Sequence, residues 1–199
     1  MKRTWLVLLL SSLLACGRQP GATVGPKTPG ADHAPVALGA RYQLEPWGLS
    51  AAFPARPTEA INRLGTDSQP VVDRVLSVES EGQLYTLECV SLLGRDRTDD
   101  ATWIDNSLKS TKPKRDARVA RVGELVGRDV FVEQKDGSAA RLQLFAAGDS
   151  LFMAIVSAPE KTFDAERAEA FIGSLAYRAT WRVEPLPDLG VTLAVPHAS

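Results

Sequence analysis

The chain has 199 residues, of which 44% are hydrophobic and 24% are charged, and this length and composition fit about one globular domain. Its 23 basic and 24 acidic residues give a formal net charge of −1. Proteins that bind DNA or RNA through the phosphate backbone carry a clear excess of basic residues. The composition therefore argues against that class, and we expect no nucleic-acid partner.

Residues 1–16 have the pattern of an export signal. Lys2 and Arg3 give a basic start, and an apolar run from Thr4 to Ala15 follows. As a helix this run would span roughly 18 Å, well short of the ~30 Å hydrocarbon core of a bilayer. A cleaved signal peptide therefore fits these residues better than a transmembrane helix does.

Cys16 decides the kind of signal. The sequence Leu13-Leu14-Ala15-Cys16 resembles the lipobox of bacterial lipoproteins, in which the cysteine is acylated and becomes the mature N-terminus, although Leu14 is bulkier than usual there. The resemblance implies lipidation at Cys16 and a lipid-anchored place in the bacterial cell envelope, because each buried methylene adds about 0.8 kcal/mol of membrane affinity. Gly17 in place of Asp implies the outer membrane if the host has two. The alternative is an ordinary signal with an incidental cysteine.

The following residues, 17–40, are rich in Gly, Pro and Ala and contain almost no large apolar side chain. Such a segment cannot bury enough surface to order itself, so we expect a disordered tether with a reach of about 25 to 30 Å. His33 lies in it without a second ligand nearby, and no metal site is predicted there.

Residues 41–180 have the pattern of a folded domain. Residues 47–57 read as a short strand that ends at a Pro-bounded turn. Residues 70–93 alternate apolar and polar side chains on both sides of the tip Ser80-Glu81-Gly82-Gln83, which predicts a β-hairpin. Three further strands, separated by turns at Asp136-Gly137 and Gly148-Asp149, are indicated by residues 128–134, 139–147 and 151–158.

Two helices complete the domain. Residues 99–112 begin with the candidate caps Asp99 and Asp100, have apolar side chains at helical spacing and stop before Pro113. Residues 164–177 begin with the candidate cap Asp164 and have a similar apolar face. The order of hairpin, helix, antiparallel meander and helix predicts an α+β domain with helices packed on an antiparallel sheet.

This order and several short segments resemble the PsbP-like superfamily, which includes Mog-type and DcrB-type proteins. The segments are "FPARPTEA", "QLYTLECVSL", "TDDATWID", the strand pair over residues 127–156, and a closing "AFIGSLAY" that has Leu175 where such lipoproteins commonly have Phe. The resemblance covers residues 42–178 and implies a three-layer α/β/α sandwich and an accessory or partner-binding role. None of these segments is catalytic, and no functional residue carries over.

A catalytic set is not evident in the sequence. The two histidines, His33 and His197, lie outside the predicted domain, and Cys89 occupies an apolar position within a strand, where a buried and inert thiol is expected. Clustered carboxylates around Asp96 and Asp99 are interleaved with arginines, and their spacing matches no EF-hand loop, so we expect no metal and no cofactor. A hydrolase that uses Asp96 or Asp99 is the least favoured function.

One basic patch could contact a partner. Its residues follow the first predicted helix, and they suit either the solvated end of that helix and a strand face, or a surface for anionic lipid or an acidic protein. They are Lys109, Lys112, Lys114, Arg115, Arg118 and Arg121.

Residues 181–199 form a C-terminal extension with an internal echo. Residues 41–54 and 180–196 share an aromatic residue, then Glu-Pro, then a Gly-led apolar alternation that ends at Pro. The extension is either the start of a degenerate second repeat, poorly packed on the first domain, or a loose terminal strand.

Together these features predict a lipid-anchored, non-enzymatic accessory or binding protein of the cell envelope. Its expected partners are the membrane, through the N-terminal lipid, and a protein or an envelope surface. The alternative is a carrier of a small ligand or metal ion that uses a cleft of the same domain.

Overall fold

The computed structural model describes residues 38–44, 47–66, 69–92, 99–109, 111, 113, 116–133, 137–178, 181–186 and 191–196. Within these residues the protein is α+β and consists mostly of sheet. The α+β class predicted from the sequence is confirmed. Among the described residues, no helix is long and apolar enough to cross a membrane.

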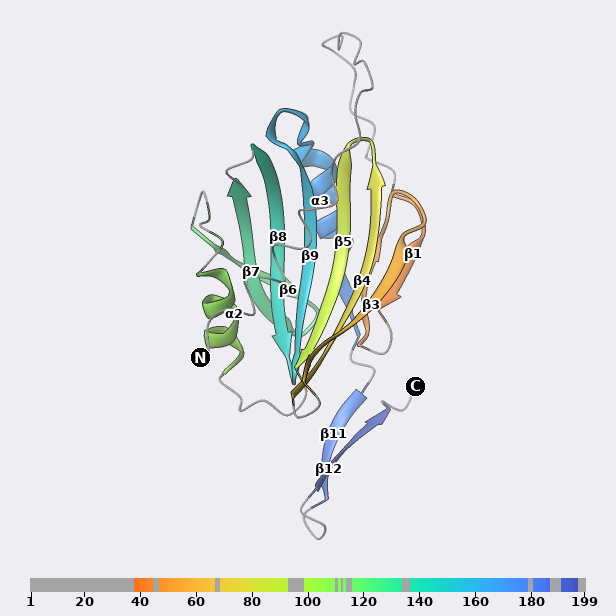
Figure 1. The fold of residues 1–199 in the computed structure, drawn as a ribbon, viewed down its shortest axis with the longest axis vertical. Coiled ribbons are helices and arrows are strands. Elements are labelled where there is room, and N and C mark those ends of the chain that lie inside the picture. The colour runs from red at the N-terminus through yellow and green to blue at the C-terminus, as the bar shows by residue number, and fades with distance from the viewer. Residues whose placement is uncertain are drawn as a thin grey trace. The chain divides into compact units, whose positions relative to one another are not determined.

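Seven antiparallel strands form the main sheet, in the spatial order β3-β4-β5-β9-β8-β7-β6 (Figure 1). They are β3 (Thr58–Thr66), β4 (Gln69–Ser80), β5 (Gln83–Leu92), β6 (Arg118–Val122), β7 (Leu125–Glu133), β8 (Ser138–Ala147) and β9 (Ser150–Pro159). The predicted hairpin tip is confirmed, because Ser80 pairs with Gln83 and both Glu81 and Gly82 have positive φ, as the favoured two-residue turns require.

A smaller sheet has the order β1-β2-β10 and consists of β1 (Arg41–Leu44), β2 (Leu49–Ala52) and β10 (Ala176–Tyr177). The remaining strands, β11 (Trp181–Leu186) and β12 (Val191–Pro196), pair with each other as a two-stranded sheet. Both segments of the sequence echo are therefore antiparallel hairpins. Leu44 pairs with Leu49 across the first loop, and Leu186 pairs with Val191 across the second. A second repeat stays a prediction.

The helices are α2 (Asp100–Leu108) and α3 (Ala165–Gly173), and a 3-10 turn, η1 (Glu160–Thr162), precedes α3. Asp99 and Asp164 cap them as predicted, since Thr102 N donates to Asp99 Oδ1 at 2.8 Å and Arg167 N donates to Asp164 Oδ1 at 3.1 Å. Helix α2 ends at Leu108, earlier than predicted, because the hydroxyl of Thr111 donates to the Leu108 carbonyl at 2.7 Å and closes the last turn.

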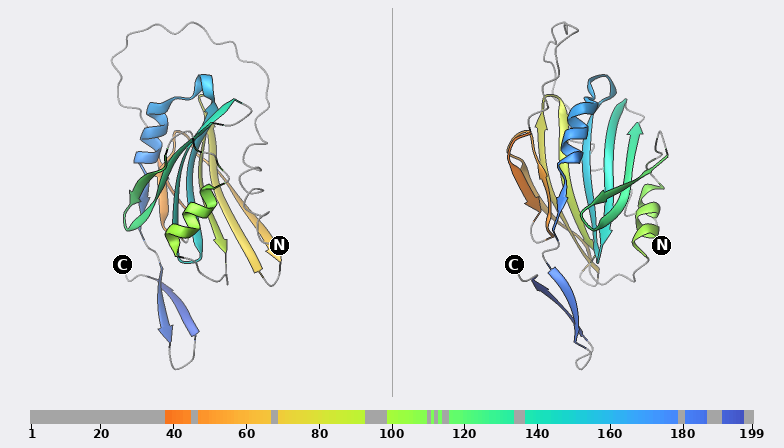
Figure 2. Two further views of the ribbon diagram at one scale, coloured as in Figure 1. Left: turned by 90° about the vertical axis from the view of Figure 1, so that its left-hand side faces the viewer. Right: turned by 180° about the vertical axis from the view of Figure 1, so that it is seen from behind.

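The two helices lie against opposite faces of the main sheet (Figure 2, left). We call the faces the α3 face and the α2 face. Because side chains alternate along a strand, the paired residues Phe145 and Phe152 belong to the α3 face, and the paired residues Leu144 and Met153 belong to the α2 face.

The largest core cluster fills the space between the α3 face, helix α3 and the small sheet. Phe171 of α3 makes edge-to-face contacts with Phe53 and Tyr85, with ring centroids 5.1 and 5.4 Å apart. Leu44 and Leu49 of the small sheet are fully buried in the same cluster. Burial of each of these side chains stabilises the folded protein by about 1.5 to 3 kcal/mol. The cluster therefore holds the small sheet and α3 on the main sheet.

Strands β1, β3, β6 and β10 were not predicted from the sequence. The predicted helix over residues 164–177 was wrong at its end, because α3 ends at Gly173 and Ala176–Tyr177 forms β10. Strand β3 is an edge strand, and every side chain from Thr58 to Arg63 is exposed, so no apolar alternation marks it. Strand β6 buries only Ala120 and Val122, and its apolar residue Val119 is exposed. A strand is recognised in a sequence by alternating apolar and polar residues, which arise when one of its faces is buried. These edge strands bury too few apolar side chains to show that alternation.

Candidate functional site

The edge strand β6 carries an exposed apolar side chain between two exposed arginines. Among the described residues it pairs with β7 alone, and the turn Gly123-Glu124 joins the two strands. Gly123 has a φ of 59°, and a Cβ there would lie 3.0 Å from the Tyr177 carbonyl oxygen. A glycine is therefore required both by the backbone conformation and by the close approach of β10.

The side chains of β6 alternate between the two sheet faces. Ala120 and Val122 are buried on the α3 face, whereas Val119 and Arg121 belong to the α2 face and are exposed. Val119 is 63% exposed, and Val126, which pairs with Arg121, is 42% exposed. Two apolar side chains and an arginine thus face solvent at one edge of the α2 face, and we call Val119, Arg121 and Val126 the edge patch.

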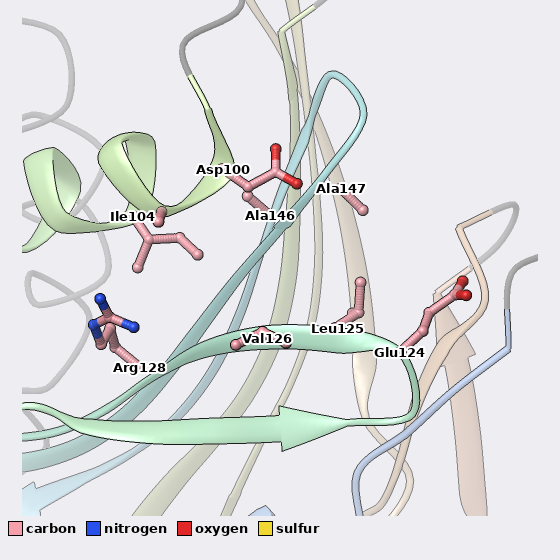
Figure 3. A pocket seen from close by; sticks show the side chains of 9 residues that line it. Asp100, Ile104, Glu124, Leu125, Val126, Arg128, Ala146 and Ala147 are labelled. Carbon is pink, nitrogen blue, oxygen red and sulfur yellow. The ribbon is translucent and has the colours of Figure 1, made fainter.

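A cleft of about 420 Å³ lies next to the edge patch, between α2 and the start of β7 (Figure 3). Its apolar lining comes from α2, β7 and the end of β8, and consists of Ala101, Ile104, Leu125, Val126, Ala146 and Ala147. Asp100, Glu124 and Arg128 are its charged residues. Val126 belongs to both the cleft and the edge patch, so the two form one continuous surface.

Arg128, one of the charged residues of this cleft, and the neighbouring Asp99 have structural roles. Arg128 Nε lies 3.1 Å from Asp105 Oδ1 and so ties β7 to α2. Hydrogen bonds from Thr102 hold the pKa of Asp99 below its usual value. Asp99, one of the two residues considered for hydrolysis, therefore serves as a helix cap, and Asp96 lies outside the described residues. Within the described part of the chain, no group of three His, Cys, Asp or Glu side chains could hold a metal ion.

The structure places three residues of the predicted basic patch. Lys109 is exposed at the end of α2, where its Nζ donates to Asn106 Oδ1 at 2.6 Å. Arg118 and Arg121 are both exposed on β6, but their positions put them on opposite faces of the sheet. Lys112, Lys114 and Arg115 lie outside the described residues, as do Cys16, His33 and His197.

The position of Pro113 extends the edge beyond β6. Pro113 pairs with Val132, and Arg118 pairs with Asp129, so both residues lie along the same side of β7. Lys114 and Arg115 lie between these two residues in the sequence. From Lys109 to Arg121 the chain has six basic residues and one acidic residue, which is a strong local excess in a protein of net charge −1.

A buried pair of carboxyl groups was missed in the sequence. Asp73 on β4 and Glu88 on β5 both belong to the α2 face and are 5% and 1% exposed. Burial, and then the charge of Asp73, raise the pKa of Glu88 to about 8. The predicted hairpin tip held a signal for this pair. A two-residue turn at Glu81-Gly82 pairs Ser80 with Gln83, which places Asp73 opposite Val90 and therefore close to Glu88, two residues away on the same face.

Two further groups have structural roles. Cys89 is fully buried, and burial raises the pKa of its thiol far above the usual value, which agrees with the predicted inert cysteine. On the α3 face, Arg141 binds Asp129 through two hydrogen bonds of 2.7 and 3.2 Å and also pairs with Glu169 of α3. This network ties β7 and β8 to α3.

No family model matches the sequence, and no curated protein matches it. Among solved structures, a protein of Bacteroides thetaiotaomicron is similar with a TM-score of 0.44 and 13% identity. The match covers 75% of this chain and 54% of that one. A likeness at this TM-score carries no argument about fold or function, so the interpretation of the site depends on its own geometry.

Proposed function

We propose that this protein is a lipid-anchored, non-enzymatic accessory protein of the bacterial cell envelope that binds a partner through the edge patch and the adjoining cleft. The lipobox sequence at Cys16 and the Gly/Pro/Ala-rich residues 17–40 support the anchor and the tether. With Gly17 after the cysteine, the proposed place is the outer membrane in a host with two membranes. The partner is a protein or an envelope surface.

The exposure of Val119 and Val126 is the observation that carries the proposal. Strand edges of soluble proteins are usually protected by charge or by a covering segment, because an exposed apolar edge invites pairing with another chain. Here two apolar side chains, 63% and 42% exposed, lie beside a cleft with an apolar lining. Such a patch next to a concavity is typical of a binding surface.

A PsbP-like α/β/α sandwich is part of the proposal. The position of α2 and α3 on opposite faces of an antiparallel sheet supports it. The superfamily is best known for accessory and partner-binding roles, which agrees with a site that has hydrogen-bonding and apolar groups but no nucleophile paired with a base.

A carrier of a small ligand is the second candidate. The cleft of about 420 Å³, apolar with Asp100, Glu124 and Arg128 at its border, favours a small amphipathic molecule. Calorimetry with a ligand and metal panel tests it. Heats of binding that disappear in Ala101→Trp, which places a large side chain at the exposed wall of the cleft, support the carrier, whereas uniform silence contradicts it.

Crosslinking in living cells tests the accessory function. The lipidated protein should capture the same partner reproducibly, and Cys16→Ser should reduce capture because it removes the anchor that concentrates the domain at the membrane. Incorporation of labelled palmitate into the wild type but not into Cys16→Ser is the control for lipidation. Absence of a specific partner, or capture that ignores the anchor, contradicts the proposal.

A further inference from the structure

We propose that the partner supplies an acidic, extended segment that pairs with β6 as an eighth strand of the main sheet. This inference rests on the proposed function and names the chemistry of its partner. It follows from three features of β6: the direction of its outward backbone groups, the exposure of Val119, and the two exposed arginines Arg118 and Arg121.

The backbone of β6 has hydrogen-bonding groups that point away from β7 and that pair with no other described strand. The turn between Val122 and Leu125 has two residues, so these flanking residues form a hydrogen-bonded pair of the ladder, and such pairs alternate from there. By this alternation, Val119 and Arg121 direct their N–H and C=O groups away from β7. An incoming strand could therefore hydrogen bond to the N–H and C=O groups of both residues, as in other cases of strand addition.

The side chains of β6 specify what the incoming strand should carry. An antiparallel strand would place one residue opposite each of Arg118, Val119, Ala120 and Arg121. Carboxylates suit the two exposed arginines, and an apolar side chain suits Val119. Read in its own direction, the added segment is acidic, small, apolar and acidic.

Charge favours an acidic protein over a second copy of this chain. Arg118 and Arg121 are both exposed on β6, so two copies paired edge to edge would bring four arginines together. An anionic lipid surface would also meet this charge. However, a lipid surface would not pair with the outward backbone groups of β6 or pack against Val119 between the arginines. A variant that removes one of these backbone groups therefore distinguishes the two partners.

The probe is a labelled hexapeptide, acetyl-Ser-Glu-Ala-Val-Glu-Ser-amide, and its affinity for the full chain is measured by fluorescence anisotropy at low and high salt. Val119→Pro removes an outward N–H without touching the ladder to β7, and Val119→Thr changes the same side chain but keeps the N–H. Circular dichroism confirms that both variants fold. Two further probes are compared: the same peptide with Lys in place of both Glu residues, and vesicles of phosphatidylglycerol.

We expect the Glu peptide to bind the wild type and Val119→Thr, with affinity that falls as salt rises. Val119→Pro should bind about tenfold more weakly, as the loss of a backbone hydrogen bond implies, and the Lys peptide should not bind. Failure of the wild type to bind, or equal binding by Val119→Pro, overturns the inference, as does binding of vesicles alone. Unchanged crosslinking by Val119→Pro in cells would leave the proposed function standing and remove strand addition.

Discussion

Asp73 and Glu88 lie on neighbouring strands of the α2 face, and their carboxyl groups hydrogen bond to each other in a buried position. Asn62 Nδ2 donates to Asp73 Oδ2 at 3.0 Å, whereas Asp73 Oδ1 and Glu88 Oε2 have no hydrogen-bond partner among the described residues. Burial raises the pKa of both groups, that of Glu88 to about 8. At neutral pH the pair therefore holds one proton, which Glu88 donates to Asp73.

This pair makes the protein less stable as the pH rises. A carboxyl group whose pKa is raised by folding stabilises the protein fully at a pH below its pKa in the unfolded chain. This stabilisation is lost as the pH rises through its pKa in the folded protein. The free energy of unfolding should therefore fall by roughly 2 to 5 kcal/mol between about pH 5 and pH 8. Urea unfolding over this range measures it.

Glu88→Gln should remove most of the fall in the free energy of unfolding with pH, because the amide of the glutamine can donate to Asp73 at every pH. Glu79→Gln is the matched control, since Glu79 is on the same strand face but exposed, and it should keep the wild-type slope. A wild-type stability that is flat from pH 5 to pH 8, or a slope that survives in Glu88→Gln, would contradict the shared proton.

The pair of Arg141 and Asp129 should matter for stability. Arg141 and Asp129 are 21% and 18% exposed, and burial alone would raise the pKa of Asp129, but hydrogen bonds from Arg141 and Gln143 hold it below its usual value. Arg141→Met leaves a half-buried carboxylate without its cation and should cost about 2 to 3 kcal/mol. Asp129→Asn in the same chain should recover part of this loss. Additive effects in the double-mutant cycle would show that the pair is not coupled.

Gly127 on β7 lies too close to β8 for a larger side chain. A Cβ at this position would lie 1.9 Å from the Leu144 carbonyl oxygen and 2.6 Å from Phe145 Cδ1. Gly127→Ala should therefore destabilise the protein by on the order of 3 kcal/mol, measured as a lower midpoint of thermal unfolding. Gly173→Ala, with no atom within 4 Å of the added Cβ, should be close to neutral. Equal midpoints for the two variants would contradict this packing.

Much of the fold follows from patterns in the sequence that report burial. The hairpin between β4 and β5, strands β8 and β9, and the caps Asp99 and Asp164 were predicted, since each has apolar alternation or a polar residue at a defined position. Strands β3 and β6 were not, because edge strands leave most of their side chains in solvent.

The candidate site was only partly predictable for the same reason. Local charge marked Arg118 and Arg121, but their separation onto opposite sheet faces depends on β6 being a strand. Val119 is an ordinary apolar residue in the sequence, and its exposure is a property of the assembled sheet. The cleft joins residues of α2, β7 and β8 that are distant in the chain, so no local pattern contains it.

Site-specific photocrosslinking in cells tests the central claim most directly. Benzoylphenylalanine in place of Val126 reports on the edge patch and cleft, and the same residue in place of Ile61, which is 55% exposed on the opposite edge strand β3, is the matched control. The proposed function predicts a specific adduct from position 126 and none from position 61. Equal adducts from both positions, or an adduct from position 61 alone, would contradict it.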